Sequence, residues 1–535
     1  MTIKIGDTAY YSKSILESDI SNFVNITGDF NPKSINKFYM KSIGQEKALV
    51  PNVFLQSLIS ASLGAKMPGF GTIYLGQETD FIADVFVNDT ITFKSEVIDI
   101  QEKSAFSIVK IKVDGYNQDS TLVASGVATV IPPKKQETKV VIKSEFKGAV
   151  SKNPHPLGCK EAVRRQIEYI KDHGKFNGPK KVLIIGASSG YGLATRIAAA
   201  FGSGADTIGV SFELGISDKR IGTAGWWNNI WFKQFAEEKG LKAKNFVGDA
   251  FGDKMKQEVI DYIKKEFGGK VDLIVYSLAA GRRTDPKDGK TYTSALKNRD
   301  HEISAPTIDM ATQKLVMSKM EKATQADIDN TVKVMGGEDW KLWIEALKEA
   351  KVLAEGCITT SYSYEGPHAM YDIYEGGTIG AAKRDLEEKA LEINEMLKPL
   401  KGESFVAVAK ALVTKASAYI PLFPIYCSIL YKVMKENGTH EDCIAQIQRF
   451  MADMVYGDKR VVDNKGRVRP DNLEMDPVVQ AKVEEVMATI NDSNLMQNSD
   501  FAGFRQEFLE LNGFDFDNVD YDQPVDLEEL AKLHY

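Results

Sequence analysis

Two hydrophobic patterns divide the chain near residue 131. Before it, residues 54–67 (FLQSLISASLGAKM) carry apolar residues at helical spacing, and the stretches DTITFKSEVIDI and FSIVKIKVDGY alternate as antiparallel strands do. One long helix and a run of strands predict an α+β unit in which the helix packs on a curved sheet. Residues 131–139 (IPPKKQETK) combine two prolines with a charge run, which is typical of a linker.

Beyond the linker, the pattern changes to alternating strands and helices. The runs KVLIIGAS, DTIGVSFE and VDLIVYSLAA are typical of central strands in a parallel sheet, and DKMKQEVIDYIKKEF has helical spacing. This alternation predicts a doubly wound α/β domain. The region after about residue 290 is expected to be largely helical. We therefore predict an α+β domain at 1–131, a linker at 132–140 and an α/β domain with large helical additions at 141–535.

Composition narrows the class of protein. A chain of 535 residues is too long for one core, and 43% hydrophobic with 26% charged residues is typical of a globular protein. A net charge of −7 gives no electrostatic reason to bind nucleic acid or an anionic membrane. The most apolar stretch, 416–431, is short and contains Pro421 and Pro424, which favours a buried pocket wall over a membrane span.

The cysteines and the N-terminus bear on location. The four cysteines lie far apart without CxxC spacing, which argues against a disulfide framework or a zinc site. The opening stretch MTIKIGDTAYYSKSILE lacks the unbroken apolar core of a signal peptide. We expect a cytoplasmic protein with no metal.

A glycine-rich turn marks a nucleotide site. The run VLIIGASSGYGLATRIAAAFG places Gly186, Gly190 and Gly192 after a predicted strand and at the opening of a helix, as a pyrophosphate requires. The next strand ends at Glu213, where an acid would hold the adenosine ribose hydroxyls and repel a 2′-phosphate, so NAD(H) is favoured over NADP(H). A solvated strand end is the alternative for Glu213. The strand ends at 249–250 and 277–279 are expected at the same crevice.

A tyrosine and a lysine stand nine positions apart at Tyr374 and Lys383. On one helix they would point to opposite faces. The pair Gly376–Gly377 predicts a bend before a helix that begins near Thr378, whose hydroxyl would cap it, so Tyr374 can fold back toward Lys383. A lysine cation there would lower the tyrosine pKa from about 10 and could hold the nicotinamide ribose. Chance is the alternative, since the chain has 20 tyrosines.

Such a pair beside a nicotinamide fits two reactions. In a carbonyl reductase, hydride goes to the carbonyl carbon and tyrosine protonates the oxygen. In an enoyl-thioester reductase, hydride goes to the β-carbon and tyrosine steadies the enolate oxygen. Tyr364, in SYSYEGP, is placed to contact a thioester carbonyl, or it is a core residue with a satisfied hydroxyl. The residues alone leave these alternatives open.

From about 145 to 525 the sequence resembles the trans-2-enoyl-CoA reductases and the FabV-type enoyl-acyl-carrier-protein reductases. The matching stretches include HPLGC, the glycine-rich run, KVMGGEDWKLWIEAL, SYSYEGP, GTIGAAK, KALVTKAS and GRVRPDNLEM. The hallmark of this family is a Tyr-x8-Lys pair. The resemblance implies a Rossmann core enlarged by helices, and reduction of the trans-2,3 double bond of an acyl thioester with NADH, without flavin or metal.

The resemblance also implies roles for single residues. Tyr374 would be the proton donor, Lys383 would support it and bind cofactor, and Tyr364 would bind substrate. Glu365 and Glu375 stand where the family leads us to expect an apolar residue and an arginine, so a different substrate orientation or chain-length preference is expected. The implied NAD contacts are Gly186, Ala187, Ser188, Ser189, Gly190, Tyr191, Phe212, Glu213, Asp249, Ala250, Leu278, Ala279, Lys383, Leu412, Val413 and Thr414.

Residues 1–131 resemble a MaoC-like hotdog domain of the (R)-specific enoyl-CoA hydratase kind. The likeness rests on TGDFNPKSI, PGFGTIYLGQETDF and VNDTITF. Asp29 and Asn31 of the hydratase site remain, but Ser34 stands at the histidine position and the first 150 residues contain no histidine. A serine hydroxyl cannot exchange protons near neutral pH as imidazole does, so we expect weak or absent hydratase activity. The alternative is that Asp29 acts alone as the base.

Because hotdog domains commonly pair, a homodimer through this domain or delivery of the thioester is its expected role. The sequence as a whole predicts an NADH-dependent reductase of short-chain enoyl-CoA, taking crotonyl-CoA to butyryl-CoA. Enoyl-acyl-carrier-protein reduction in fatty acid synthesis is the alternative, and an active hotdog domain would make the chain a bifunctional hydratase–reductase. A non-catalytic NAD- or acyl-CoA-binding protein is disfavoured because Tyr374, Lys383 and Tyr364 are all present.

Overall fold

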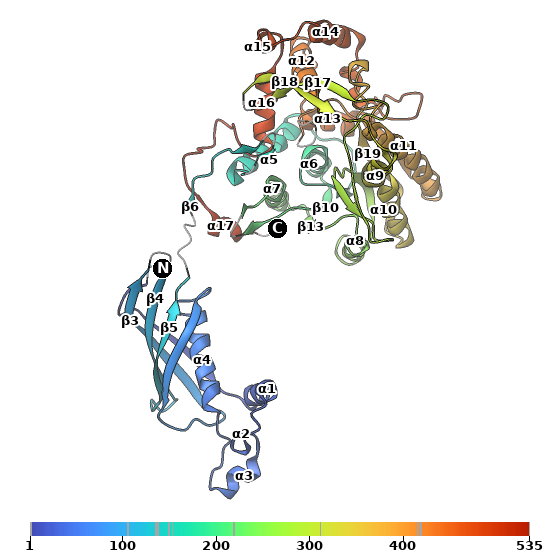
Figure 1. The fold of residues 1–535 in the computed structure, drawn as a ribbon. Helices are drawn as coiled ribbons and strands as arrows, with labels where there is room; N and C mark the ends of the chain where they lie inside the picture. The colour runs from blue at the N-terminus through green and yellow to red at the C-terminus, as the bar shows by residue number, and fades with distance from the viewer. Residues whose placement is uncertain are drawn as a thin grey trace. The chain divides into compact units, whose positions relative to one another are not determined.

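The chain folds into two compact units, 1–137 and 138–535, in a computed structural model (Figure 1). The structure describes residues 3–103, 106–133, 139–147, 150–151, 153–217, 220–310, 312–414, 417, 420–533 and 535. Within the predicted linker 132–140, residues 134–138 lie outside the described residues. The predicted domain limits at 131 and 141 stay predictions.

The N-terminal unit is one antiparallel sheet packed on one long helix. The strands are β1 (Thr8–Ser14), β2 (Ile73–Phe81), β3 (Thr90–Glu102), β4 (Ser107–Tyr116) and β5 (Leu122–Ile131), in the order β1-β3-β4-β5-β2. Helix α4 (Asn52–Ala65) buries Leu55, Ile59 and Leu63 against alternating residues of these strands, which confirms the α+β hotdog prediction. The shorter helices are α1 (Glu17–Thr27), α2 (Pro32–Ile35) and α3 (Lys37–Ser42).

The C-terminal unit is built on a parallel sheet of six strands. These are β9 (Lys181–Ile185), β10 (Asp206–Ser211), β13 (Ala243–Val247), β14 (Val271–Tyr276), β19 (Leu353–Ser363) and β20 (Glu403–Val408). Their order is β13-β10-β9-β14-β19-β20, and every neighbouring pair is parallel. This is the Rossmann order, in which the chain reverses direction across the sheet between β9 and β14.

Helices cover both faces of this sheet (Figure 1). Helices α5 (Pro156–Asp172), α6 (Gly190–Ile197) and α7 (Ala224–Glu238) share a core with Val182 and Ile184 of β9. Helices α8 (Asp253–Glu266), α10 (Glu338–Glu349) and α11 (Thr378–Leu397) share another core with Leu183 and Ile185. Alternate residues of one strand therefore fill two cores, which explains its unbroken apolar sequence.

The region after residue 290 is less helical than predicted. It supplies strands β19 and β20 of the central sheet, the hairpin β17 (Ile303–Asp309)–β18 (Lys314–Met320) and strand β16 (Thr291–Thr293), which pairs with β15 (Arg282–Thr284). Strand β19 contains several polar residues, so its sequence lacks the apolar run of a central strand. Its place in the sheet depends on pairing with β14 and β20, which lie far from it in sequence. The remaining helices of this region are α9 (Gln325–Met335), α12 (Phe423–Glu436), α13 (Cys443–Arg449), α14 (Pro477–Met487), α15 (Leu495–Asn498) and α16 (Phe501–Glu510).

Helix α12 contains residues 423–431 of the apolar stretch 416–431, in which 416 and 418–419 lie outside the described residues. Its residues Ile425, Ile429 and Leu430 are fully buried in a core shared with α14 and α16. Within the described parts of the chain, no helix is long and apolar enough to cross a membrane.

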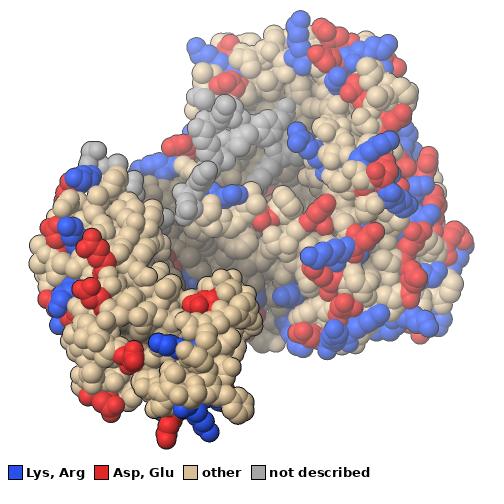
Figure 2. Space-filling view, turned by 60° about the horizontal axis from the view of Figure 1, so that its bottom comes forward, with Lys and Arg blue, Asp and Glu red and all other residues tan. Residues whose placement is uncertain are grey.

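Short elements complete the C-terminal unit. Strand β6 (Lys139–Val140) pairs with β21 (Val525–Asp526), which is followed by α17 (Leu527–Ala531). Two further short pairs are β7 (Phe146–Lys147) with β8 (Val150–Ser151) and β11 (Ile216–Ser217) with β12 (Arg220–Ile221). Single irregular helical turns lie at 198–202, 368–370, 398–400, 450–455 and 470–473. Figure 2 shows basic and acidic residues interspersed over the visible face of the larger unit, while much of the smaller unit's visible face carries neither.

Candidate active site

The turn between β9 and α6 has the geometry that a pyrophosphate needs. Gly186 and Gly190 adopt φ values of +94° and +52°, which side chains other than glycine rarely allow. A Cβ on Gly192 would overlap the carbonyl oxygen of Gly186, so the third glycine permits close packing of helix on turn. At Gly190 a Cβ would have its nearest neighbour 3.9 Å away, at Thr414. The face of the turn beside the N-terminus of α6 is therefore open to an anion.

Glu213 is held beside this turn and is not a solvated strand end. Its Oε1 accepts a hydrogen bond of 2.6 Å from the hydroxyl of Ser188, and its Oε2 accepts one from Thr223. A Cβ on Gly225 would overlap Oε1, so the carboxylate lies against the backbone of α7. The neighbouring Phe212 is exposed. The contact of Glu213 with the ribose hydroxyls stays a prediction.

Apart from Lys383 on α11, the other predicted cofactor residues follow carboxyl ends of strands. Asp249 and Ala250 come after β13, Leu278 and Ala279 after β14, and 412–414 after β20. Because the strands are parallel, their carboxyl ends lie at one edge of the sheet, where open α/β folds bind ligands. Tyr191 donates a 2.8 Å hydrogen bond to the carbonyl of Lys410, which ties the glycine turn to the loop after β20.

Tyr374 lies in a turn ahead of α11, as predicted, and the helix begins at Thr378. Glycines allow this turn by close approach: a Cβ on Gly377 would overlap the carbonyl of Ile373, and one on Gly380 would overlap the carbonyl of Tyr374. The predicted cap by Thr378 is wrong. Gly377 is the N-cap residue, and the Thr378 hydroxyl donates to the carbonyl of Ala295.

Tyr374, Tyr364 and Lys383 converge at the carboxyl end of β19. The rings of Tyr364 and Tyr374 meet edge to face with centroids 4.6 Å apart. The Lys383 ammonium donates a 3.0 Å hydrogen bond to the carbonyl of Tyr362, two residues before Tyr364. The Tyr374 hydroxyl makes no hydrogen bond with any residue that the structure describes, which leaves it available to a substrate.

Burial governs the protonation of these groups. It raises the pKa of Tyr374 and of Tyr364 well above the ordinary tyrosine value of 10.0. The prediction of a lowered pKa for Tyr374 is therefore wrong, because removal of the phenolate from water dominates and the nearby Cys427 and Glu474 raise the pKa further. Burial also lowers the pKa of Lys383 to about 8. Tyr374 keeps its proton at neutral pH, as a proton donor must.

The two unexpected glutamates are engaged in ion pairs. Glu365 Oε2 lies 3.0 Å from Arg467 and 3.0 Å from Arg469. Glu375 lies 2.7 Å from Arg384. Both carboxylates are thus neutralised by neighbouring arginines, and an altered substrate preference stays a prediction.

Sequence reasoning missed a buried carboxyl, Glu474, whose side chain contacts Tyr364. Its Oε1 accepts hydrogen bonds from the hydroxyls of Tyr364 at 3.2 Å and Tyr426 at 2.6 Å, and its Oε2 accepts one from the Ala411 N–H at 2.7 Å. Its side chain is fully buried. Glu474 lies in GRVRPDNLEM, one of the stretches that match the family, and this place could have marked it as a candidate. Its neighbours in sequence do not predict the contact with Tyr364, which lies 110 residues earlier in the chain.

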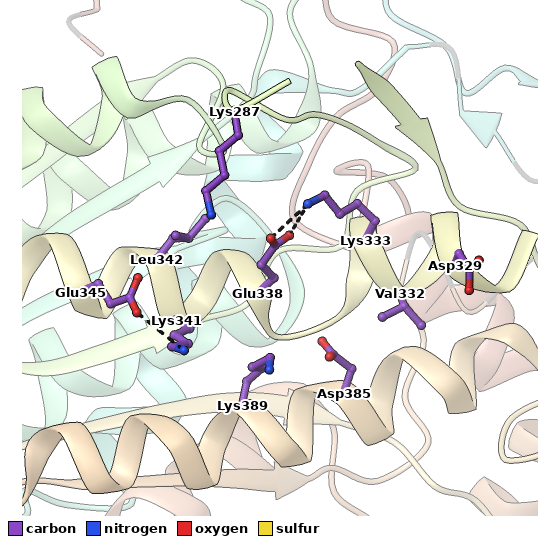
Figure 3. Close-up of a pocket in the computed structure, with 10 residues that line it drawn as sticks. All are labelled: Lys287, Asp329, Val332, Lys333, Glu338, Lys341, Leu342, Glu345, Asp385 and Lys389. Carbon is purple, nitrogen blue, oxygen red and sulfur yellow. Dashed lines mark hydrogen bonds and ion pairs between the residues drawn. The ribbon is translucent and has the colours of Figure 1, made fainter. Parts of the chain in front are cut away.

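Two cavities of the C-terminal unit differ in the residues that line them. The larger, about 590 Å³, lies between α9, α10 and α11 and is lined by charged side chains that already pair, such as Lys333 with Glu338 (Figure 3). No predicted site residue lines it. The smaller, about 370 Å³, is lined by Ser189, Gly190 and Val413 among others. The smaller cavity is therefore the one that reaches the nucleotide turn.

The hydratase positions of the N-terminal unit do not form a catalytic group. Asn31 caps α2, its side-chain oxygen accepting from the Lys33 N–H at 3.0 Å. Ser34 is buried within α2, and Asp29 is exposed. Across the described residues of the whole chain, no group of three or more His, Cys, Asp or Glu side chains is placed to hold a metal ion.

Family models match most of the chain. The NAD(P)H binding domain of trans-2-enoyl-CoA reductase matches 141–218, and the trans-2-enoyl-CoA reductase catalytic region matches 220–456. An enoyl reductase FAD binding domain matches 462–525, and a FAS1-like dehydratase domain region matches 5–125.

Residues 462–525, all of them described, do not fit an FAD. They form α14, α15, α16 and the turn at 470–473, and buried side chains such as Val483 and Phe504 pack in the core of α12. The segment contains no strand followed by a glycine turn and a helix, so it offers no second pyrophosphate site.

Individual relatives match about three quarters of the chain at about 50% identity. Trans-2-enoyl-CoA reductase (NADH) of Clostridium beijerinckii is 53% identical over 397 residues, which are 74% of this chain and 100% of the relative. Enoyl-acyl-carrier-protein reductase (NADH) 2 of Photobacterium profundum is 48% identical over 398 residues, 74% of this chain and 100% of the relative. The crystal structure of Clostridium acetobutylicum trans-2-enoyl-CoA reductase in complex with NADH matches with a TM-score of 0.73 at 51% identity, over 74% of this chain and 100% of that one. The chain therefore belongs to the trans-2-enoyl-CoA reductase family.

Proposed function

We propose that the chain reduces the trans-2,3 double bond of short-chain enoyl-CoA thioesters with NADH, as from crotonyl-CoA to butyryl-CoA. The observation that carries this proposal is the convergence of Tyr374, Tyr364 and Lys383 at the carboxyl end of β19, beside strands that present a nucleotide turn. Membership of the reductase family supports the same reaction.

We assign each residue one role in this reaction. Bound NADH supplies the hydride that adds to the β-carbon. Tyr364 holds the thioester carbonyl through its hydroxyl, and Tyr374, protonated at neutral pH, donates the proton that completes reduction. Lys383, as a cation below about pH 8, holds the cofactor. The glycine turn binds the pyrophosphate, and Glu213 selects NADH by repelling a 2′-phosphate.

Coenzyme A is the proposed carrier, and acyl-carrier protein is the alternative. Relatives named for the two carriers are nearly equally similar, at 53% and 51% identity for two CoA reductases and 51% for a Burkholderia ambifaria acyl-carrier-protein reductase. Similarity therefore does not separate them, and direct comparison of the two thioesters must.

The test is NADH oxidation by the purified protein with crotonyl-CoA and, in parallel, with crotonyl-acyl-carrier protein. Turnover with NADH that exceeds turnover with NADPH and collapses in Tyr374→Phe supports the proposal. Preference for the carrier-protein thioester would move the substrate to the alternative. Absence of turnover with both thioesters would overturn the reductase function.

We infer that the N-terminal unit forms a homodimer through the edge of β2. This strand is outermost in its sheet, and its free edge pairs with no other strand among the described residues. Long, apolar free edges template pairing with another chain. Antiparallel pairing of β2 with its copy would cover exposed apolar residues, which include Phe70 (87% exposed), Ile73 (56%), Leu75 (51%) and Ile82 (53%).

The oligomeric state tests this inference. Leu75→Lys on the outer edge strand should convert the dimer to a monomer in light scattering, because a buried unpaired charge opposes association. Tyr10→Lys is the matched control, since Tyr10 is 59% exposed on β1, at the opposite edge of the sheet. A monomeric wild type, or a dimer that Leu75→Lys leaves intact, would contradict the inference.

We propose no hydratase activity for this unit. No imidazole is present in residues 1–150, Asn31 is used as a helix cap, and Ser34 is buried. Hydration of crotonyl-CoA by the full chain without NADH should not exceed the background. Hydration that Asp29→Asn abolishes would instead establish the bifunctional alternative. The cytoplasmic location stays a prediction from the scattered cysteines.

A further inference from the structure

Glu474 forms hydrogen bonds with three segments that lie at or near the proposed reaction site. It follows the turn at 470–473, and its two oxygens accept from Tyr364 and Tyr426 on one side and from the Ala411 N–H on the other. Tyr364 is the proposed substrate tyrosine, and Ala411 begins the loop that ends in the predicted NAD contacts 412–414. A fully buried carboxyl at this junction has no part in the reaction as described above.

An ionised carboxylate is an acceptor only, whereas a protonated one carries a donor. With Glu474 ionised, the single hydroxyl proton of Tyr364 points to Oε1, so it cannot be donated to a thioester carbonyl at the same time. With Glu474 protonated, Oε1 can donate its one proton to the hydroxyl oxygen of Tyr364, and the proton of Tyr364 is then released to point elsewhere. Oε2 accepts from Ala411 in both states, so the cofactor loop stays in place.

The charges that face Glu474 leave both states accessible. Burial raises its pKa to about 7, while the hydrogen bond from Tyr426, the Lys410 cation and the Ala411 N–H oppose that rise. Asp471 adds to the rise, although Arg469 pairs with it at 2.6 Å. The group loses its proton near neutral pH.

We propose that Glu474 is a positioning residue whose single proton decides whether the Tyr364 hydroxyl donates to Glu474 or to the thioester carbonyl of the substrate. The proposal rests on the proposed function, because it takes Tyr364 as the residue that binds the thioester. No bond to carbon changes in this step; one proton moves between Glu474 and solvent, and hydrogen bonds reverse direction. Activity therefore requires protonated Glu474 and falls as pH rises.

The test is the pH profile of kcat/KM for crotonyl-CoA at saturating NADH. In the wild type kcat/KM should fall about tenfold per pH unit above the pKa of Glu474. In Glu474→Gln the amide cannot lose a proton and donates as the protonated acid does, so kcat/KM should keep its low-pH value through that range. Glu507→Gln is the matched control, because Glu507 is also buried with a pKa raised to about 7 but accepts from Tyr431 at 2.7 Å.

Two further variants ask whether Glu474 acts through Tyr364. In a Tyr364→Phe background, Glu474→Gln should change kcat/KM by less than a factor of two, because coupled residues are not additive. Tyr426→Phe removes a hydrogen bond that lowers the pKa of Glu474, so the fall in kcat/KM should move to higher pH. This variant keeps the proposal testable if Glu474→Gln does not fold.

The outcomes separate the two claims. No turnover by the wild type with either thioester overturns the proposed function and this inference with it. Turnover with the same pH profile in wild type and Glu474→Gln overturns the inference alone. A fall that Glu507→Gln abolishes equally, or that Tyr426→Phe leaves in place, also overturns it.

Discussion

The ring of Tyr374 packs edge to face against the ring of Tyr364, with centroids 4.6 Å apart and planes at 72°. Phe423, the first residue of α12, packs edge to face against both rings. The two hydroxyls thus belong to one cluster of packed aromatic rings. Replacing either tyrosine by phenylalanine would preserve the ring packing and remove only the hydroxyl.

Removing each hydroxyl should therefore separate their roles. Tyr374→Phe should lower kcat by about 10²–10⁴-fold with little change in KM for crotonyl-CoA, because it removes a proton donor. Tyr364→Phe should raise that KM, because it removes a contact made in the bound state as well as in the transition state. Steady-state kinetics with both variants checks this, and a raised KM in Tyr374→Phe with unchanged kcat would exchange the two assignments.

Lys383 should make NADH binding depend on pH. Its ammonium is present below its pKa of about 8 and is lost as pH rises through that value, since burial disfavours the cation. The dissociation constant for NADH should therefore rise between pH 7 and 9 in a fluorescence titration. Lys383→Met should show the weaker affinity at every pH. An affinity for NADH that does not vary over this range would contradict the role.

The same shift in Lys383 has a stability consequence of defined sign. Its pKa is lower in the folded chain than its ordinary 10.5, so the unfolded chain binds more protons between about pH 8 and 10.5. The free energy of unfolding contributed by this group therefore rises with pH across that window. The stability difference between wild type and Lys383→Met, from urea unfolding at several pH values, should follow this trend.

Glu213 should control the choice between NADH and NADPH. Glu213→Gln removes the charge but retains an oxygen that can accept from Ser188. The ratio of kcat/KM for NADH to that for NADPH should fall by at least about tenfold, which is about 1.4 kcal/mol. Asp249→Asn is the matched control, because this exposed carboxyl follows a neighbouring strand and should affect both cofactors alike. An unchanged ratio in Glu213→Gln would contradict this role and indicate that Glu213 is only structural.

Glu365 should contribute to stability rather than to chain-length choice. It is one of three carboxylates around the buried Arg467, together with Glu387 and Asp463. Glu365→Leu removes one charged hydrogen-bond partner and should cost about 1.5–3 kcal/mol of unfolding free energy. Denaturant unfolding measures this cost, and kcat/KM with four-, six- and eight-carbon enoyl-CoA measures chain-length choice. A changed preference with unchanged stability would support the substrate role instead.

Glu375→Leu is the control for that experiment. Its ion pair with Arg384 is partly exposed, and pairs of this kind contribute about 0–1 kcal/mol. The difference between the two leucine variants therefore reports on burial of the partner arginine rather than on loss of a glutamate as such.

Several parts of the site follow from local sequence. The glycine turn, the places of Glu213 and Asp249 two residues after β10 and β13, and the start of α11 at Thr378 were all predictable, because strand pattern, turn glycines and helix starts depend on neighbouring residues. The cap of α11 was not predictable. Whether Thr378 caps the helix or donates to Ala295 depends on a backbone segment more than eighty residues away.

Local sequence is enough to predict the two-unit organisation, the parallel sheet, the nucleotide turn and the Tyr-x8-Lys pair, because each depends on periodicity, on glycine spacing or on a stretch shared with a family. Tertiary structure alone decided the protonation of Tyr374 and Lys383 and brought Glu474 to Tyr364. The physical reason is that pKa values and buried hydrogen bonds depend on which groups exclude water from each other, and those groups meet only when distant segments fold together.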